Sequence, residues 1–461
     1  MTTVPLRISW RFWLCTAAIL AGLMMLAAEP GWLTAQQWAA AALALGAIVF
    51  WGSGALPEAL TAFLFMALAV VGLSAPEIVF SGFLSPAFWL VAGGMIFGLA
   101  VARTGLGARV ALRLATLFGT RYAALVFGIV LSSALLAFPM PSALGRAVLV
   151  MPIVVALAEA AGYPAGSRGY RGLILAGVFG SFMPGFAVMP ANLINLVLVG
   201  AAERLLDHHF LYGDWLLRFY PVMGFLRTLA IATLVLLFYR EAPQAQVDAA
   251  PSQSPVRASE WRLGLILVLA IVGWGTDVLH GLSPAWIAML AAAVCLLPRV
   301  GVLEPKEIAS LGFGPLLYVA GILALGAVVA DSGLGARVTA GLLQAVDLQA
   351  VGPLGGFAAV TGTAILVAMG TTLPGAAAVM VPLAPDIGIA AGLSLDAVLS
   401  AIMLGCSTPL LPYQAAPMVV ALQLGGVSMA AGTRFALMIA AVTILLLLPL
   451  EILWLMAIGL L

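Results

Sequence analysis

Long apolar runs follow one another along nearly the whole chain, and polar positions are confined to short segments between them. The runs lie near residues 12–28, 36–54, 58–73, 85–103, 122–138, 145–161, 172–200, 217–239, 261–280, 282–298, 312–330, 349–368, 374–392, 395–422 and 435–460. A helix needs about 20 apolar residues to cross a bilayer. Several runs are shorter, so not all of them need to cross. The pattern predicts an all-α polytopic membrane protein.

The composition excludes an ordinary water-soluble protein. Of the 461 residues, 64% are hydrophobic and only 8% are charged, whereas soluble domains carry about 25% charged residues. The net charge of +1 gives no reason to expect nucleic acid as a partner. The three cysteines and three histidines show no disulfide or metal-ligand spacing. We therefore expect no cofactor.

Two segments divide the chain. Residues 1–35 hold the first apolar run behind Arg7 and Arg11 and are predicted to form an N-terminal span, because no cleavage site for a signal peptide stands out. Residues 241–260 are polar, contain three prolines and are predicted to be a cytoplasmic linker. The predicted domains between and after them are residues 36–240 and 261–461.

The two halves resemble each other in sequence. VARTGLGARV at residues 101–110 matches VADSGLGARV at residues 329–338 in eight of ten positions, an offset of 228. At the same offset, VAG at 91–93 matches VAG at 319–321. At a nearby offset of 230, Pro152 matches Pro382. Because these matches keep their order, we interpret the halves as internal repeats.

Each repeat contains a helical hairpin with a Pro- and Gly-rich tip. Residues 122–161 are broken by FPMPSALG at 138–145, and residues 349–392 are broken by MGTTLPG at 369–375. Basic residues flank the first hairpin at both outer ends, which predicts that both arms start and end on the cytoplasmic side. We therefore expect two re-entrant hairpins whose tips reach the middle of the membrane.

Counting the hairpins as non-crossing leaves one leading span and five crossings per repeat, about 11 transmembrane helices in total. An odd number of crossings inverts the second repeat. Of the 19 basic residues, this topology places 14 inside, 3 outside and 2 within the membrane, as the positive-inside rule expects. It predicts an inner-membrane protein with a cytoplasmic N-terminus and a periplasmic C-terminus.

Two further runs are broken by prolines, at residues 183–195 (MPGFAVMPANLIN) and 407–417 (STPLLPYQAAP). With the two hairpin tips, they give four sets of helix ends at similar depth. Helix N-termini attract anions, and freed carbonyls suit a cation. Inverted repeats with broken helices are typical of secondary transporters, whose site lies near the midplane of the membrane.

These segments resemble, in this order, those of the divalent anion/sodium symporters, which carry dicarboxylates, citrate or sulfate. The resemblance rests on SPAFWLVAGGMIFGLAVARTGLG, the hairpins ending in MPIV and VPLA, the break PANLIN and the closing segment LPYQAAPMVVALQLGGVSMAAGTRFALM. It implies a cation-coupled, elevator-type carrier of a small anion that forms a homodimer in the bilayer. That family has Ser-Asn-Thr at each tip, whereas this chain has Ser142-Ala143-Leu144 and Thr372-Leu373-Pro374, which leaves the coupling ion open between Na⁺ and H⁺.

The candidate site residues are polar or small residues at the tips and breaks. The expected substrate-binding residues are Ser142, Ala143, Arg146, Asn192, Asn195, Thr371, Thr372, Ser407, Thr408 and Gln414, and the expected cation-binding residues are Ser142, Gly145, Asn192, Thr372 and Gly375. For each of them, an ordinary interhelical hydrogen bond is the alternative. Asp386 and Glu159 in the hairpin arms are possible proton carriers, although an interfacial position is also open to them.

Arg146 lies just beyond the first tip in an otherwise apolar arm. A charge at that depth costs at least about 2.5–3.5 kcal/mol, so it faces a cavity or a partner. Arg146 either binds an anionic group of the substrate or has a structural role, in which it pairs with a carboxylate or caps carbonyls. Arg227, in the middle of the run 217–239, is interpreted as a residue that snorkels or pairs at the scaffold.

The favoured function is a secondary active transporter of a di- or tricarboxylate or of sulfate. The alternatives are a proton-coupled or exchanging carrier of another small organic solute, or a transporter-like ligand sensor. An enzyme is not expected, because the apolar runs hold no nucleophile–base pair, metal cluster or paired carboxylates.

Overall fold

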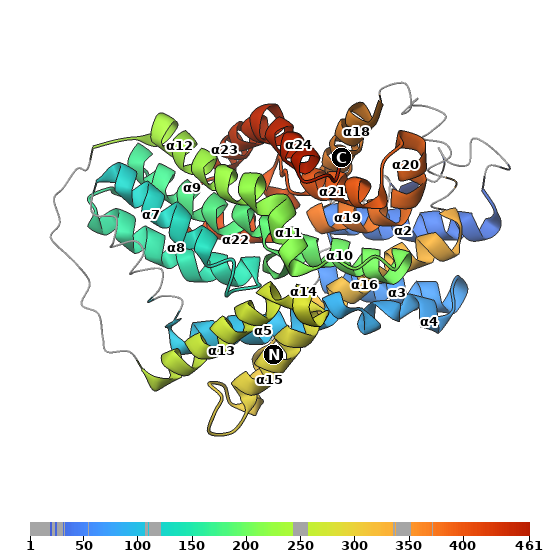
Figure 1. The fold of residues 1–461 in the computed structure, drawn as a ribbon, viewed down its shortest axis with the longest axis horizontal. Coiled ribbons are helices and arrows are strands. Elements are labelled where there is room, and N and C mark those ends of the chain that lie inside the picture. The colour runs from blue at the N-terminus through green and yellow to red at the C-terminus, as the bar shows by residue number, and fades with distance from the viewer. Residues whose placement is uncertain are drawn as a thin grey trace.

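A computed structural model describes residues 33–53, 55–106, 121–242, 257–334, 352–370 and 372–461, together with residues 19, 20, 24, 31, 109 and 337. Every regular element in this part of the chain is helical (Figure 1). The predicted all-α class is thereby confirmed. The apolar run of the predicted N-terminal span lies almost entirely outside the described residues, and so do residues 243–256 of the predicted linker.

The first half consists of short and long helices separated by Pro and Gly. Its elements are α2 (Ala35–Ser53), α3 (Glu58–Gly72), α4 (Pro76–Val79), η1 (Ser81–Leu84), α5 (Pro86–Thr104), α7 (Tyr122–Leu135), α8 (Ala143–Ala160), α9 (Arg168–Phe182), η2 (Met183–Ala187), η3 (Met189–Ala191), α10 (Leu193–Leu206), α11 (Tyr212–Phe219), η4 (Tyr220–Leu226) and α12 (Arg227–Tyr239).

The second half repeats this order of elements. It contains α13 (Ala258–Gly275), α14 (Asp277–His280), α15 (Pro284–Leu296), η5 (Pro305–Ser310), α16 (Gly314–Asp331), α18 (Gly352–Gly370), α19 (Leu373–Met380), η6 (Val381–Leu383), α20 (Ala384–Ala391), α21 (Leu395–Cys406), η7 (Pro412–Gln414), α22 (Ala416–Leu424), α23 (Met429–Val442), η8 (Thr443–Leu447) and α24 (Leu448–Ala457). In both halves, a helix pair is followed by a helix, a break at prolines, a second helix and a long helix interrupted by a π-helical segment, η4 or η8.

Six helical segments of the described chain are long and apolar enough to cross a membrane. They are residues Ala143–Ala160, Tyr212–Tyr239, Gly314–Asp331, Gly352–Met369, Leu373–Ala391 and Met429–Ala457. Six further apolar helices, such as α3 and α15, have between 10 and 17 residues. The fold is therefore that of a polytopic membrane protein, while the predicted number of crossings and the re-entrant course of the hairpins stay predictions.

Helices from the two halves interlock. Helix α5 of the first half packs along α15 of the second, and α16 of the second half packs along α3 of the first. The repeated VAG motif explains the contacts: a Cβ on Gly93 would lie 3.1 Å from the carbonyl carbon of Ala288, and a Cβ on Gly321 would lie 2.9 Å from the Cα of Ala62. Small residues let membrane helices approach this closely. These helices, with α2, α4 and α13, form one group, called here the scaffold.

The hairpins and breaks form a second group beside the scaffold (Figure 1). Helices α7 and α8 both pack on α9, and α18, α19 and α20 pack on α21. The helix that follows each break packs on the hairpin of the other half, α10 on α19 and α22 on α8. Through these contacts between the halves, both hairpins and both breaks form one group, called here the hairpin assembly.

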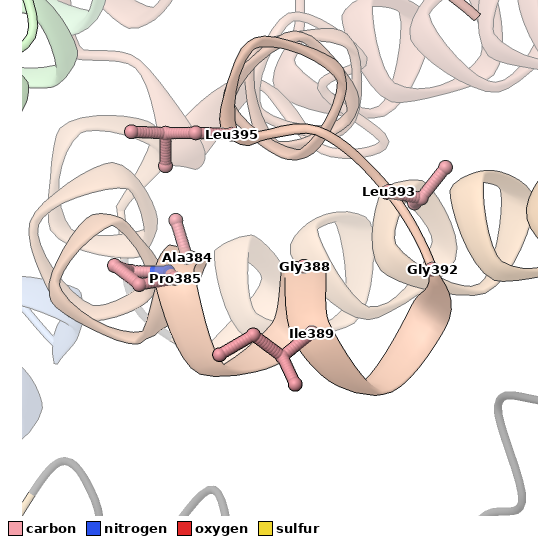
Figure 2. Close-up of a pocket in the computed structure, with 7 residues that line it drawn as sticks. All are labelled: Ala384, Pro385, Gly388, Ile389, Gly392, Leu393 and Leu395. Carbon is pink, nitrogen blue, oxygen red and sulfur yellow. The ribbon is translucent and has the colours of Figure 1, made fainter.

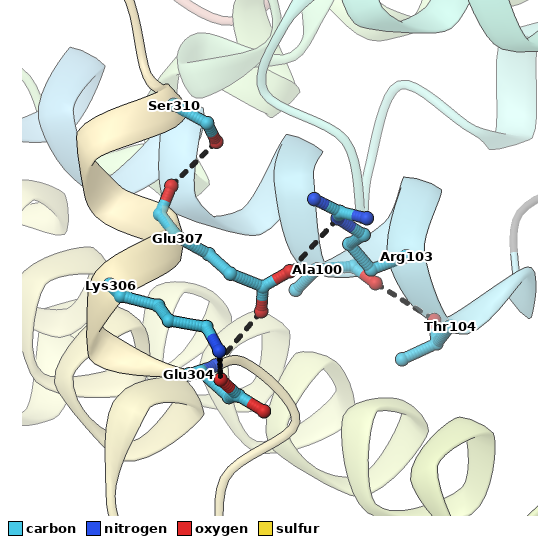
Figure 3. Close-up of polar contacts among 7 residues, drawn as sticks. All are labelled: Ala100, Arg103, Thr104, Glu304, Lys306, Glu307 and Ser310. Carbon is cyan, nitrogen blue, oxygen red and sulfur yellow. Dashed lines mark hydrogen bonds and ion pairs between the residues drawn. The ribbon is translucent and has the colours of Figure 1, made fainter.

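Charged side chains gather where α5 ends and η5 begins (Figure 3). Nε of Arg103 lies 2.9 Å from a carboxylate oxygen of Glu307, and Lys306 pairs with Glu304. Glu307 also accepts a hydrogen bond from the backbone N–H of Glu304 at 2.9 Å, which caps η5. Two of the basic residues predicted to lie on one side of the membrane are thus close together in space.

Candidate functional site

The first hairpin tip ends in a capped helix. Ser142 has extended backbone angles and is the N-cap of α8, and its Oγ accepts a hydrogen bond from the backbone N–H of Gly145 at 3.0 Å. Ser142 is half-buried, and Ala143, the first residue of α8, is buried. The cap satisfies one free N–H of the helix and leaves other N–H groups of the first turn at the tip.

The second tip has the same local geometry. Thr372 is the N-cap of α19, and its Oγ1 accepts a hydrogen bond from the backbone N–H of Gly375 at 3.2 Å. The hydroxyl of Tyr318 in α16 lies 3.2 Å from the same Oγ1, so this tip is also bonded to the scaffold. Thr371 lies outside the described residues.

Asn192 holds the first break to the first hairpin. Its side chain is fully buried, its Nδ2 donates to the carbonyl of Phe182 at 3.2 Å, and its Oδ1 accepts from Nη2 of Arg146 at 3.0 Å. Asn192 also precedes α10 as its N-cap residue, without a side-chain bond to that helix. The side-chain amide of Asn192 therefore links the first break to Arg146, which lies just beyond the first tip.

Asn195 donates hydrogen bonds to backbone carbonyls within the first break. Its Nδ2 donates to the carbonyls of Gly185, Phe186 and Val188 at 3.0, 3.2 and 3.0 Å. Its side chain is fully buried, and its Oδ1 accepts no hydrogen bond from any described residue. A buried acceptor without a partner is rare in folded proteins, which makes this oxygen a candidate ligand for a cation or a donor group.

Arg146 is fully buried and bonded mainly to backbone carbonyls. Nε donates to the carbonyl of Ser181 at 2.9 Å, and Nη1 donates to Met140 and, at 2.8 Å, to Ala191. With the Nη2 bond to Asn192, four of its five N–H groups have partners among the described residues. These contacts are the ones expected if Arg146 caps carbonyls, which is one of the roles that the sequence leaves open. They tie the tip, the end of α9 and the first break into one unit.

Gln414 makes corresponding hydrogen bonds at the second break. Gln414 is buried, its Oε1 accepts from the backbone N–H groups of Leu410 and Leu411 at 2.8 and 2.7 Å, and its Nε2 donates to the carbonyl of Ala368 in α18 at 2.8 Å. Irregular backbone at membrane depth requires such internal partners. Gln414 therefore joins the second break to the second hairpin, as Arg146 and Asn192 join the first.

Ser407 and Thr408 lie at the C-terminal end of α21. Both hydroxyls donate to the carbonyl of Leu404 at 2.9 Å. The carbonyl of Ser407 accepts from Nη1 of Arg227 at 2.9 Å. Arg227 is fully buried, so it contacts the end of a broken helix and does not snorkel to the surface.

The electrostatics of these elements favour an anion. Helices α8, α10, α19 and α22 all begin at a tip or a break, so their positive ends lie within one assembly. Two arginines are buried beside them, and the predicted site residues that are described include no carboxylate. A hollow of about 450 Å³ elsewhere, lined by Ala384, Pro385, Gly388, Ile389, Gly392, Leu393 and Leu395, is apolar and does not fit an anion (Figure 2).

Sequence reasoning missed one buried charge. Glu451 in α24 is fully buried, and the signal was present as a carboxylate inside the apolar run 435–460. Asp386 and Glu159, which were considered as proton carriers, are half-buried and exposed respectively.

Residues 8–461 match the family model described as the sodium:sulfate symporter transmembrane region. The dicarboxylate transporter 2 of spinach chloroplasts is 26% identical over 60% of this chain and 51% of its own length. The L-tartrate/succinate antiporter of Escherichia coli K12 is 26% identical over 48% of this chain and 47% of its own length. The chain thus aligns with about half the length of these relatives.

One solved structure has a similar fold. The Alcanivorax borkumensis YdaH transporter superposes with a TM-score of 0.58 at 19% identity, over 86% of this chain and 89% of that one. At this identity the likeness concerns the fold alone.

Proposed function

Because the chain belongs to the sodium:sulfate symporter family, we propose that it is a cation-coupled secondary transporter of small dicarboxylates. The observation that carries this proposal is the gathering of four helix N-termini and two buried arginines around the tips and breaks. Such an arrangement stabilises a compact dianion at membrane depth. The printed names of the spinach and E. coli relatives point to the same substrate class.

In this proposal the substrate contacts the tips and breaks directly. The hydroxyls of Ser142 and Thr372, with the N–H groups of the first turns of α8 and α19, bind the carboxylates. Asn195 Oδ1, which lacks a partner among the described residues, and the freed carbonyls are available to a cation. Arg146 supplies positive charge and holds this geometry through its carbonyl bonds.

Transport by an elevator movement requires the hairpin assembly to slide against the scaffold. Small residues line the contact: a Cβ on Gly94 of α5 would lie 3.0 Å from Cγ of Pro141 at the first tip. In the second repeat, a Cβ on Gly326 of α16 would lie 3.6 Å from Cγ of Pro382 in the second hairpin. A shear movement slides packed helices past each other, and a glycine at the contact presents no side chain that would obstruct it.

The proposed setting is a homodimer in the inner membrane with the N-terminus in the cytoplasm and the C-terminus in the periplasm. The proximity of Arg103 and Lys306 (Figure 3) supports a common side for the basic residues. Cysteine labelling from either side of the membrane, at Lys306 and at Asp207, tests this orientation. Labelling of both positions from the same side would contradict it.

Exchange of one dicarboxylate for another is the second candidate mode. It is favoured by the absence of the family's Ser-Asn-Thr pattern at both tips and by the name of the antiporter relative. The two modes differ in what they need on the far side of the membrane: symport needs a cation gradient, whereas exchange needs internal substrate.

The test is uptake into proteoliposomes that contain the purified protein. Labelled succinate, tartrate, citrate and sulfate are offered with imposed Na⁺ or H⁺ gradients, and separately with internal unlabelled substrate. We expect saturable succinate uptake that Asn192→Leu abolishes and the surface variant Glu77→Gln retains. Binding without flux would indicate a ligand sensor, and no uptake of any anion would overturn the proposed function.

A further inference from the structure

The last long helix of each half carries one fully buried charge. In the first half, the helical stretch Tyr212–Tyr239 contains Arg227 directly after the π-helical segment η4. In the second half, the stretch Met429–Ala457 contains Glu451 one turn after the π-helical segment η8. Both side chains are 0% exposed. π-Helical segments occur frequently at functional sites.

These two helices pack on each other. Helix α24 contacts η4 and α11, η4 contacts η8, and α12 contacts α23. Nε1 of Trp454 in α24 donates to the carbonyl of Leu217 in α11 at 2.8 Å, which fixes their relative position. Glu451 and Arg227 thus lie on contacting helical stretches, and in the described part of the chain no ion pair joins them.

Glu451 differs from the other buried charges among the described residues. Arg146 is bonded to carbonyls, and Glu260 lies 2.6 Å from Arg109. Neither carboxylate oxygen of Glu451 has a hydrogen-bond partner in the part of the chain that the structure describes, and the Nε of Arg227 has none there either. An ionised carboxylate without hydrogen bonds is strongly unfavourable in an apolar interior, and such a group takes up a proton instead.

The elements that pack near Glu451 carry few other ionisable groups that could bind or release a proton in its place. The ionisable side chains on α11, η4, α12 and α23 are Tyr212, Asp214, Arg218, Tyr220, Arg227, Tyr239 and Arg434. Arg218 is already paired with Asp396. Arg227 is the fully buried charged residue among them.

We propose that Glu451 is the binding site of the coupling proton and that Arg227 is its switching partner. In the arrangement described here, Glu451 carries the proton and Arg227 donates to the carbonyl of Ser407 at the end of α21. Loss of the proton to water leaves a carboxylate, which attracts Arg227 away from Ser407 and frees that end of the second break. This inference rests on the proposed function and names its coupling ion.

The first measurement does not depend on transport. Infrared difference spectra of the protein in lipid, recorded across a pH titration, report a protonated carboxyl in an apolar site. We expect a carboxyl band in the unaltered protein that disappears in Glu451→Gln, shifts in Glu451→Asp and persists in the surface control Glu77→Gln. A band unchanged in Glu451→Gln, or no such band in the unaltered protein, would overturn the inference.

The second measurement uses the same variants in proteoliposomes. Glu451→Gln imitates the protonated carboxyl, so we expect it to keep exchange of internal for external succinate and to lose accumulation driven by a pH gradient. Retention of pH-driven accumulation by this variant, or accumulation by the unaltered protein that needs Na⁺ and ignores the pH gradient, would refute proton coupling at Glu451. Absence of all flux with the carboxyl band intact would reject the proposed function and leave the proton site standing.

Discussion

Gly321 in α16 lies against Ala62 in α3, so close that a Cβ on Gly321 would be 2.9 Å from the Cα of Ala62. The two residues belong to different halves of the chain, and Gly93 makes the equivalent approach to Ala288 in α15. The interlock of the halves therefore depends on the same glycine in each copy of the repeated motif.

Gly321→Leu is expected to destabilise the scaffold strongly, because inserted side-chain atoms have no space at the helix crossing. Overpacking of this kind costs about 1–3 kcal/mol or more. The melting temperature of the purified protein in detergent measures the effect. Gly264→Ala in α13 is the matched control, since a Cβ there meets nothing within 4 Å. Equal melting temperatures for both variants would show that the close approach is not needed.

Arg146→Gln is expected to lower succinate uptake roughly tenfold or more, a loss of about 1.4 kcal/mol or above. The substitution leaves the carbonyls of Met140, Ser181 and Ala191 without their donor, and each unsatisfied buried group costs about 1–3 kcal/mol. Stability should fall together with uptake. The exposed Arg121, replaced by Gln, is the control for loss of charge. Uptake with unchanged rate and affinity in Arg146→Gln would exclude both a binding and a clamping role.

Ser142→Ala and Thr372→Ala test the two tips as a pair. Each removes an N-cap bond to the glycine three residues later, which costs about 1 kcal/mol. Both variants should fold and show a several-fold higher KM for succinate. Thr372→Ala also loses the contact with Tyr318, so Tyr318→Phe isolates that contribution. A KM that neither tip variant alters would place the substrate away from the tips.

Much of this architecture could be predicted from local sequence. Prolines and glycines at residues 138–145 and 369–375 predict interruptions of the helix, and α7 ends at Leu135 before α8 begins at Ala143, while α18 ends at Gly370 before α19 begins at Leu373. The breaks at 183–195 and 407–417 follow for the same reason. The repeat at an offset of 228 also predicted that both halves would share one order of elements.

Other features depend on contacts between distant segments. The sequence showed the repeated VAG motif, but not that each copy faces the opposite half. It placed Arg146 within the membrane, but its partners are carbonyls of Ser181 and Ala191 about 40 residues away, and carbonyls leave no sequence signal. The π-helical segments beside Arg227 and Glu451 likewise arise from packing, because no residue type specifies them.

A disulfide between Gly94→Cys and Pro141→Cys is expected to stop transport by locking the first tip to the scaffold. A Cβ on residue 94 would lie 3.2 Å from the Cβ of Pro141, near the separation of about 3.5–4.5 Å found in disulfides. An elevator must separate these residues in each cycle, so oxidation should abolish succinate uptake and reduction should restore it. The single variants, treated with the same oxidant, control for the substitutions themselves. Unimpaired uptake by the oxidised, fully cross-linked protein would mean that the tip does not move against α5, and the elevator mechanism would have to be abandoned.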